Sequence, residues 1–473
     1  MNRKKFIRLA GTLSVSSLLT PNPLFASPRN SYPEVRTPVS KRKFTSEAVE
    51  KAIIDFGNKT NNKELAWLFN NCFPNTLDTT VDFEVIDGKP DTYVITGDID
   101  AMWLRDSTAQ VWPYLWLIKE DKQLQQLIAG VINRQAKNIL LDSYANAFYK
   151  DVTKISQWKD DFTDMKAGLH ERKWEIDSLC YPVRLSYHYW QITGDSSPFD
   201  EQWEKAAALI VKTFKEQQRI TNKGPYKFER KTSWATDGIP LGGYGYPAKP
   251  VGLIHSMFRP SDDATIFPFL IPSNFFAVIS LQQLAEMSSS IFNDAVFAKE
   301  CTVLANEVNA ALQEHAIVTH PQFGKVYAYE VNGYGSFNLM DDANVPSLLS
   351  LPYLGAVKNS DPVYINTRKL LLSEYNPFFF KGSAGEGIGG PHAGTDLIWP
   401  LSIIIRALTS NNDAEIKKCI RILQQSHAGT GYMHETFYKD DVKKFTRSWF
   451  AWANTIFGEL LHKTAITKPE LLT

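Results

Sequence analysis

Hydrophobic residues recur at helical spacing along most of the chain, and this pattern predicts a mainly α-helical protein. In residues 46–56, for example, Val49, Ile53 and Phe56 fall on one face of a helix. A second helix is predicted after Ser107, which is a residue type that often caps a helix N-terminus. The same spacing predicts further helices at 65–69, 123–141, 176–194, 199–218, 273–287, 292–315, 342–351, 362–374, 396–408, 414–425 and 448–462.

Two short segments alternate between apolar and polar residues instead. Residues 81–94 contain Asp87-Gly88, and residues 327–339 contain Asn332-Gly333, so both are predicted to be β-hairpins. Strands and helices do not alternate regularly, which disfavours a parallel α/β fold. About twelve helices in one chain of this length fit two concentric rings of helices. We therefore expect a mainly α fold, an (α/α)6 barrel forming a single catalytic domain over residues 45–465 with a few small hairpins in its loops.

Helix starts are expected from capping residues as well as from periodicity. Ser107 is expected to cap the helix that follows it, so that Arg105 and Asp106 would lie on the preceding loop. For the helix that runs to 287, Ser273 or Asn274 is the expected cap.

Charge and composition narrow the possible partners. The 473 residues contain 51 Lys and Arg and 51 Asp and Glu, so the formal net charge is zero, and we expect neither nucleic acid nor an anionic membrane surface as partner. The 12 Trp, 19 Tyr and 28 Phe provide rings that fill a core and that also stack on the apolar faces of sugars.

The N-terminus is typical of an export signal. Residues 1–26 combine a basic start, a short apolar stretch and a small-residue site near Ala26, and residues 3–8 (RKKFIR) resemble a loosened twin-arginine signal. The apolar run is too short for a stable membrane anchor, and no lipoprotein cysteine precedes Cys72. We expect a cleaved, bacterial-type signal, a linker at 27–44, and a periplasmic or secreted protein. The route of export and any surface attachment stay open. The four cysteines are far apart and are expected to be free and buried: Cys72, Cys180, Cys301 and Cys419.

Candidate chemistry gathers in loops that precede helices. The stretch at 96–107 (TGDIDAMWLRDS) joins three acids to an arginine and a tryptophan, and similar mixtures occur at 174–178, 259–263, 385–392 and 429–435. In a barrel of helical hairpins such loops meet at one end, so acids distant in sequence would converge on one pocket.

A pocket of this kind fits glycoside hydrolysis, which requires two carboxyl groups and little else from the protein. Metal chemistry is the competing interpretation, with His392, His434, Glu435 and Asp106 as conceivable ligands. These residues lack the close spacing of common metal motifs, so we expect no metal and no cofactor. A charged His434 is a conceivable aid to Glu435 beside it.

Seven segments together resemble glycoside hydrolase family 125, the exo-α-1,6-mannosidases. They occur in the family's order and span residues 96–459: TGDIDAMWLRDS, WEIDSLCYP, FRPSDDA, LIPSN, GPHAGTDLIWPLS, GTGYMHE and RSWFAWANTIFGE. The resemblance implies an (α/α)6 barrel that removes a terminal α-1,6-linked mannose with inversion and without a metal. The implied partner is a mannose-containing oligosaccharide or glycan.

The resemblance also implies roles for particular residues. The general acid would be an aspartate of FRPSDDA, for which we select Asp262 with Asp263 as the fallback, and the general base would be Glu435 of GTGYMHE. The implied sugar-binding residues are Trp103, Arg105, Asp106, Asp177, Arg259 and His392. Two alternatives stay open: an inverting barrel glycosidase for another α-glycoside, and a carbohydrate-binding protein without catalysis. The oligomeric state also stays open.

Overall fold

The structure is a computed structural model that describes residues 32–473. The expected export signal at 1–26 and the first residues of the expected linker lie outside the described residues. Residues 35–473 form one unit, in which none of the described helices has both the length and the apolar character needed to cross a membrane.

Five helices form an inner layer of this unit. α5 packs against α7 and α14, α7 packs against α9, and α12 packs against α14. Every residue of α5 is buried, and α9 and α14 are buried on most of their faces, as expected for helices surrounded by protein. The inner helices are α5 (Leu104–Val111), α7 (Ile176–Thr193), α9 (Ile271–Met287), α12 (Pro400–Leu408) and α14 (Ala451–Thr467).

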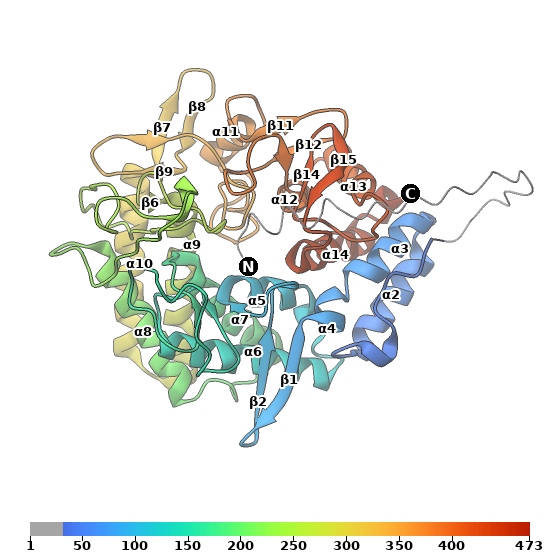
Figure 1. Ribbon diagram of the computed structural model, residues 1–473, viewed down its shortest axis with the longest axis horizontal. Helices are drawn as coiled ribbons and strands as arrows, with labels where there is room; N and C mark the ends of the chain where they lie inside the picture. The colour runs from blue at the N-terminus through green and yellow to red at the C-terminus, as the bar shows by residue number, and fades with distance from the viewer. Residues whose placement is uncertain (1–31) are drawn as a thin grey trace, which may run out of the picture. The chain divides into compact units, whose positions relative to one another are not determined.

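Amphipathic helices cover this layer from outside, each burying one face. α10 packs on α9, α13 on α12, α3 on α14 and α6 on α7. Figure 1 shows α5, α7, α9 and α14 near the middle, with α2, α3, α6, α8 and α10 farther out. The outer helices are α2 (Glu47–Lys59), α3 (Lys63–Cys72), α6 (Lys122–Leu141), α8 (Glu201–Gln218), α10 (Ala295–His315), α11 (Pro362–Leu371) and α13 (Asp413–Ser426), and a short α4 (Asn75–Thr79) follows α3. The predicted (α/α)6 barrel is confirmed.

Small antiparallel sheets connect the loops. β3 (Met102–Trp103) pairs with β4 (Ala147–Phe148), which pairs with β5 (Leu169–Glu171). β13 (Leu397–Ile398) pairs with β14 (Thr436–Tyr438), which pairs with β15 (Asp441–Thr446). These two sheets lie directly beside the segments that carry the candidate site.

The predicted hairpins are both present. β1 (Val81–Ile86) and β2 (Lys89–Val94) are joined by Asp87 and Gly88, whose φ values of 51° and 78° are those of a tight hairpin turn. β9 (Glu330–Val331) pairs with β10 (Phe337–Asn338) and with β6 (Phe269–Leu270). Two further hairpins were not predicted: β7 (Ile317–His320) with β8 (Gly324–Tyr327), and β11 (Phe379–Lys381) with β12 (Glu386–Ile388).

Several expected helix positions differ from the structure; for example, the helix expected from residue 396 begins only at Pro400. α5 begins at Leu104, so Ser107 lies inside the helix and its hydroxyl donates to the Leu104 carbonyl instead of capping. α9 begins at Ile271, and the Asn274 side chain bonds to the backbone of Ile254 and Leu270. Residues 342–351 form turns rather than a helix, because Pro346 has no N–H to donate.

Part of the expected linker packs against the helices. The Arg36 guanidinium is buried and donates to Asp78 at 2.8 Å and to Glu50 at 2.5 Å. The backbone N–H groups of Lys43 and Phe44 donate to the carbonyls of residues 78 and 77. The Pro- and Lys-rich composition of this stretch gives no indication that Arg36 forms ion pairs with two acids from other segments. The four cysteines are buried and free, as predicted.

Candidate active site

The candidate residues gather where the inner helices begin. Within residues 32–473, none of the five inner helices has a side-chain N-cap, and the residues at these positions are Trp103, Glu175, Leu270, Trp399 and Phe450. The first backbone donors bond to loop segments instead; Leu104 N donates to Asn146 O and Phe450 N donates to Met433 O. The helix starts and the connecting loops therefore build the site together.

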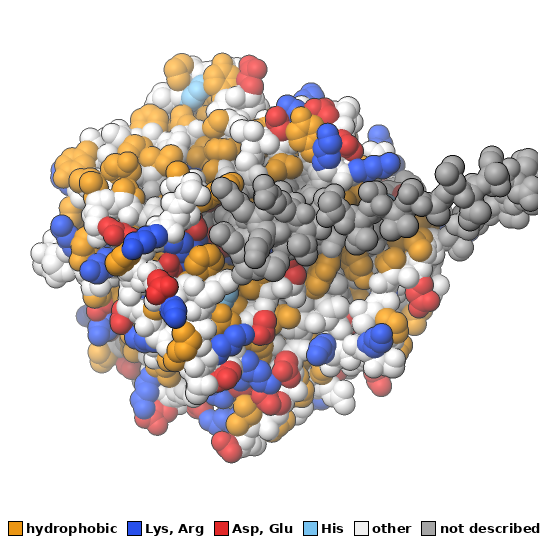
Figure 2. Space-filling view, in the orientation of Figure 1, with side chains coloured by type: hydrophobic (Ala, Val, Ile, Leu, Met, Phe, Trp, Pro, Cys, Tyr) orange, Lys and Arg blue, Asp and Glu red, His pale blue; other side chains and the backbone are white. Residues whose placement is uncertain are grey.

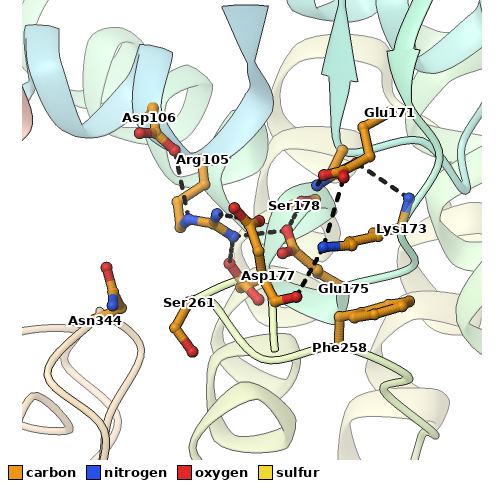
Figure 3. Close-up of polar contacts among 12 residues, drawn as sticks. Arg105, Asp106, Glu171, Lys173, Glu175, Asp177, Ser178, Phe258, Ser261 and Asn344 are labelled. Carbon is orange, nitrogen blue, oxygen red and sulfur yellow. Dashed lines mark hydrogen bonds and ion pairs between the residues drawn. The ribbon is translucent and has the colours of Figure 1, made fainter. Parts of the chain in front are cut away.

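Arg105, in the first turn of α5, is the centre of a buried charge cluster. Its Nη1 donates to Glu175 at 2.6 Å and to Asp177 at 3.1 Å. Its Nε lies 3.5 Å from Asp106, and its Nη2 lies 3.6 Å from Asp262. Figure 3 shows Arg105 pointing toward Glu175 and Asp177, with Ser261 and Asn344 on separate loops nearby. Sequence reasoning selected most of these residues but not Glu175.

Four carboxylates around one guanidinium leave the cluster short of positive charge. Burial raises the pKa of Glu175 well above its ordinary value, opposed by Arg105 and reinforced by Asp177. Burial likewise raises the pKa of Asp177, and it raises that of Asp106 to about 6. The cluster therefore retains protons at a pH where exposed carboxyl groups have lost them.

The two neighbouring aspartates of the 258–264 segment have different surroundings. The Asp262 side chain is 29% exposed and faces Arg105, whereas the Asp263 side chain is 3% exposed. Asp263 lies 3.7 Å from His392 Nδ1 and 3.5 Å from the Ser261 hydroxyl. Burial alone would raise the pKa of Asp263, but contact with His392 holds it below its ordinary value. Of the two, Asp262 is the carboxyl group accessible from the Arg105 cluster.

Glu435 lies on a separate loop, directly before β14. Its Oε2 accepts a hydrogen bond from the Thr446 hydroxyl at 2.8 Å, and its Oε1 lies 3.5 Å from Arg447 Nη1. The Glu435 side chain is 13% exposed. Arg447 also pairs with Asp98 and donates to the Thr96 carbonyl at 3.0 Å. Asp98 belongs to the charged stretch before α5, so this stretch directly contacts Arg447, the partner of Glu435.

Asp106 interacts electrostatically with Arg105 and Asp262 and also with Arg447, the partner of Glu435. Burial is the main cause of its raised pKa; Asp262 adds to the effect, while Arg105 and Arg447 oppose it. Arg447 in turn has its pKa lowered by burial and raised more strongly by Glu435, Asp98 and Asp106, so it stays charged. The structure thus brings Arg105, Asp106, Asp177, Asp262 and Glu435 into one site.

Arg259 and His392 lie on the Asp263 side of this site. Arg259 Nε donates to the buried Glu330 at 2.7 Å, and its backbone N–H donates to the Asp263 carbonyl. Asp342 accepts from the Ser261 hydroxyl at 2.7 Å, which fixes the same turn. His392 contacts the ring of Trp399 at 6.1 Å between centroids.

Several buried polar atoms near the site have no hydrogen-bond partner among the described residues. They include Trp103 Nε1, Arg259 Nη2, Tyr329 Oη and Asp177 Oδ1. Trp103 packs edge-on against His170, with ring centroids 5.1 Å apart. Unpaired buried donors and acceptors are costly unless a ligand completes them, so these atoms are suited to sugar hydroxyl groups.

The residues considered as metal ligands do not converge. Among residues 32–473, no group of three His, Cys, Asp or Glu side chains has the arrangement of a metal site. His434 stacks on Phe445 with centroids 3.8 Å apart, and burial lowers its pKa. Burial therefore disfavours the charged form of His434 that a direct aid to Glu435 would require. On the face shown in Figure 2, the described basic and acidic side chains are intermixed, in agreement with the zero net charge.

Glu175, Lys173 and Arg447 are site residues that sequence reasoning missed. Glu175 and Arg447 lie inside the quoted segments WEIDSLCYP and RSWFAWANTIFGE, and Lys173 directly precedes the first of these. Each contacts a partner from a distant segment. The available signal was the position of each charge within four residues of the start of an inner helix.

Comparisons with known proteins agree with this geometry. The family model for metal-independent alpha-mannosidases (GH125) matches residues 62–462. A Schizosaccharomyces pombe protein, the meiotically up-regulated gene 157 protein, is 43% identical over 98% of this chain and 96% of its own length.

Solved structures are similar as well. A Streptococcus pneumoniae metal-independent alpha-mannosidase, in a non-productive complex with alpha-1,6-mannobiose, has a TM-score of 0.86 and 38% identity, covering 90% of this chain and 100% of that chain. A family 78 rhamnosidase from Bacillus sp. GL1 has a TM-score of 0.52 at 9% identity, covering 86% of this chain and 35% of that chain, and supports the fold alone. The family model and the two close relatives cover most of the sequence, and the chain belongs to the metal-independent α-mannosidases of glycoside hydrolase family 125.

Proposed function

We propose that this α-mannosidase is an exo-acting enzyme that hydrolyses terminal α-1,6-linked mannose with inversion, with Asp262 as general acid and Glu435 as general base. The observation that carries the proposal is the placement of two partly exposed carboxylates on separate loops, Asp262 beside Arg105 and Glu435 beside Arg447, with both arginines acting on the buried Asp106. The relative solved with alpha-1,6-mannobiose supports the choice of linkage.

In this mechanism Asp262 gives its proton to the glycosidic oxygen as the bond to the anomeric carbon breaks. Glu435 takes a proton from a water molecule, which attacks the opposite face of the sugar, so the product is β-mannose. Thr446 and Arg447 orient the Glu435 carboxylate, and Arg105 orients that of Asp262. An inverting pair requires carboxyl groups about 6.5–9.5 Å apart, which leaves space for this water.

The remaining predicted residues would hold the sugar. Arg105, Asp106 and Asp177 form the charged floor of the site, and Arg259 and Trp103 have buried N–H groups available for hydroxyl oxygens. His392 would contribute from the Asp263 side. Charge-assisted hydrogen bonds of this kind are strong and directional, which suits selection of one sugar.

The test is turnover of α-1,6-mannobiose beside its α-1,2 and α-1,3 isomers in EDTA, with the anomer of the released mannose followed by proton NMR. Release of β-mannose from the 1,6 isomer alone is the expected result. Initial release of α-mannose would contradict inversion, and cleavage of another isomer or another α-glycoside in its place would contradict the linkage.

The two aspartates can be separated by substitution. Asp262→Asn is expected to lower kcat on mannobiose by about 10³-fold, because general acid catalysis contributes about 10²–10⁴-fold. Asp263→Asn should lower it by less than about tenfold, since Asp263 faces His392 and is buried. The reverse order would transfer the acid role to Asp263. Export to the periplasm or the medium remains a separate proposal that rests on residues 1–26.

A further inference from the structure

Lys173 is a buried cation in contact with the backbone of Asp262. Its side chain is 3% exposed, and its Nζ donates to the Asp262 carbonyl at 2.9 Å. The same Nζ lies 2.6 Å from Asp237 and 3.5 Å from Glu171, and it stands 5.0 Å from the centre of the Phe258 ring. Figure 3 shows Lys173 beside Glu171 and Phe258, on the side of the Arg105 cluster opposite Asn344.

Lys173 remains charged in these surroundings. Burial lowers the pKa of Lys173, but Glu171, Asp237 and Asp262 raise it more strongly, so its pKa lies above the ordinary value. Arg230 completes the network by bonding to Asp161 at 2.6 Å and to Glu171 at 2.9 Å. The acids of this network are shared by the two cations Lys173 and Arg230. They stabilise the Lys173 ammonium group at the point where it contacts Asp262.

The backbone of Asp262 requires such support. Its φ is +68°, in the left-handed region that residues other than glycine adopt at a cost. Asp262 N donates to the Arg259 carbonyl at 2.9 Å, and Arg259 N donates to the Asp263 carbonyl at 2.8 Å, so the segment is a tight turn. The Asp262 carbonyl points out of this turn toward Lys173, and the side chain is directed to the Arg105 side.

One small sheet carries both cations that contact Asp262. Arg105 follows β3 by two residues, and Lys173 follows β5 by two residues, while β4 pairs with both strands. Arg105 contacts the carboxylate and Lys173 contacts the carbonyl. Two contacts from one rigid sheet fix both ends of the same residue.

We propose that Lys173 is a positioning residue for the general acid, which it holds in its left-handed turn by binding the Asp262 carbonyl. This inference rests on the proposed function, because it assumes that Asp262 is the acid. Lys173 does not touch the substrate in this scheme; it acts through Asp262 alone.

The test compares two substrates that differ in their need for acid. α-1,6-Mannobiose has a poor leaving group that must be protonated, whereas 2,4-dinitrophenyl α-mannoside releases a stable anion without protonation. In Lys173→Met, kcat/KM for mannobiose is expected to fall by about 100-fold and that for the dinitrophenyl substrate by less than about threefold. Asp262→Asn should show the same selectivity more strongly.

Controls separate positioning from folding. Lys215→Met removes a lysine that pairs with Glu300 at 2.7 Å on the outer helices, and it should leave both substrates unchanged. Lys173→Arg keeps the charge and the donors, so it is expected to recover most of the mannobiose activity. If Lys173→Met does not fold, Lys173→Arg decides the question, because any loss it causes must again be larger for mannobiose.

The outcomes distinguish this inference from the proposed function. Wild-type protein that cleaves neither mannoside would overturn the function. Active wild-type protein combined with an equal loss on both substrates, in a Lys173 variant with a normal circular dichroism spectrum and melting temperature, would overturn the positioning role alone. Full mannobiose activity in Lys173→Met would overturn it as well.

Discussion

At the scale of residues, the two proposed catalytic carboxylates are fixed in different ways. Asp262 is held at its backbone by Lys173 and faces Arg105 with its side chain. Glu435 is held at both carboxylate oxygens, by the Thr446 hydroxyl and by Arg447. The hydroxyl donor and the cation beside Glu435 favour an ionised carboxylate, which is the form that a general base needs.

Thr446 offers a direct test of the Glu435 side. Thr446→Val removes the hydroxyl that donates to Glu435 at 2.8 Å while keeping the branched shape. Because every substrate needs the base, kcat should fall about 10- to 100-fold on both mannobiose and dinitrophenyl α-mannoside. Thr446→Ser keeps the donor and should stay close to wild type. A loss confined to mannobiose would place Thr446 on the acid side instead.

Single residues also show what the sequence could and could not predict. Asp262 and Glu435 stand inside long, unusual motifs, so resemblance was enough to select them. Lys173 was missed because its partner, the Asp262 carbonyl, is 89 residues away. Nothing in the sequence indicates the left-handed backbone of Asp262. Arg447 was missed for the same reason, since its contact at Thr96 is 351 residues away.

At the scale of elements, capping divides the helices into two classes. All seven long outer helices have a side-chain N-cap, and the capping residues are Ser46, Asn62, Asp121, Asp200, Asp294, Asp361 and Asn412. The inner helices, within the part of the chain described, have none. The capping rule therefore failed at α5 and α9, because the starts of inner helices are completed by loops of the site. Most outer helices start at positions that are at least partly exposed, where a local cap is the available partner.

This division predicts that outer caps affect stability but not catalysis. In Asn412→Ala the Glu415 N–H loses its acceptor at 3.1 Å, so the free energy of unfolding should fall by about 1 kcal/mol. The kcat on mannobiose should stay within experimental error of wild type, since α13 lies in the outer layer. Urea unfolding and steady-state kinetics measure the two effects. Asn412→Asp keeps the cap as control, and a matching loss of kcat in Asn412→Ala would contradict the separation of layers.

At the scale of the molecule, the site depends on contacts between distant parts of the chain. α14 packs against α3 and α5, and Arg447 beside α14 contacts Asp98 beside α5. Helical periodicity predicted most of the helices in their order along the chain, because each helix buries its own apolar face. It could not predict that residues 342–351 form turns, nor that Arg36 packs against Asp78, because both depend on contacts with other segments.

The acid-rich site should also lower the stability of the whole molecule as the pH rises. Folding raises the pKa of Asp106 from 3.8 to about 6, chiefly through burial, so the folded state binds this proton more tightly than the unfolded state does. Below pH 3.8 Asp106 is protonated in both the folded and the unfolded state, so its titration does not change the free energy of unfolding. Stability is then lost as the pH rises toward 6, and above 6 the cost is about 3 kcal/mol.

Asp106→Asn should remove this dependence on pH. Compared with wild type, the variant should gain about 3 kcal/mol in free energy of unfolding between pH 4 and pH 7.5, because Asn has no proton to lose. Urea unfolding at the two pH values measures the gain, and Asn412→Ala on the outer layer, which adds no titratable group, serves as a variant without it. The same substitution should reduce kcat/KM on mannobiose, since Asp106 contacts Arg105 and interacts electrostatically with Asp262 and Arg447. A constant difference in free energy of unfolding between Asp106→Asn and wild type across this pH range would mean that folding does not raise the pKa of Asp106. A gain in stability together with a loss of activity would show that the charge is kept for catalysis at the expense of the fold.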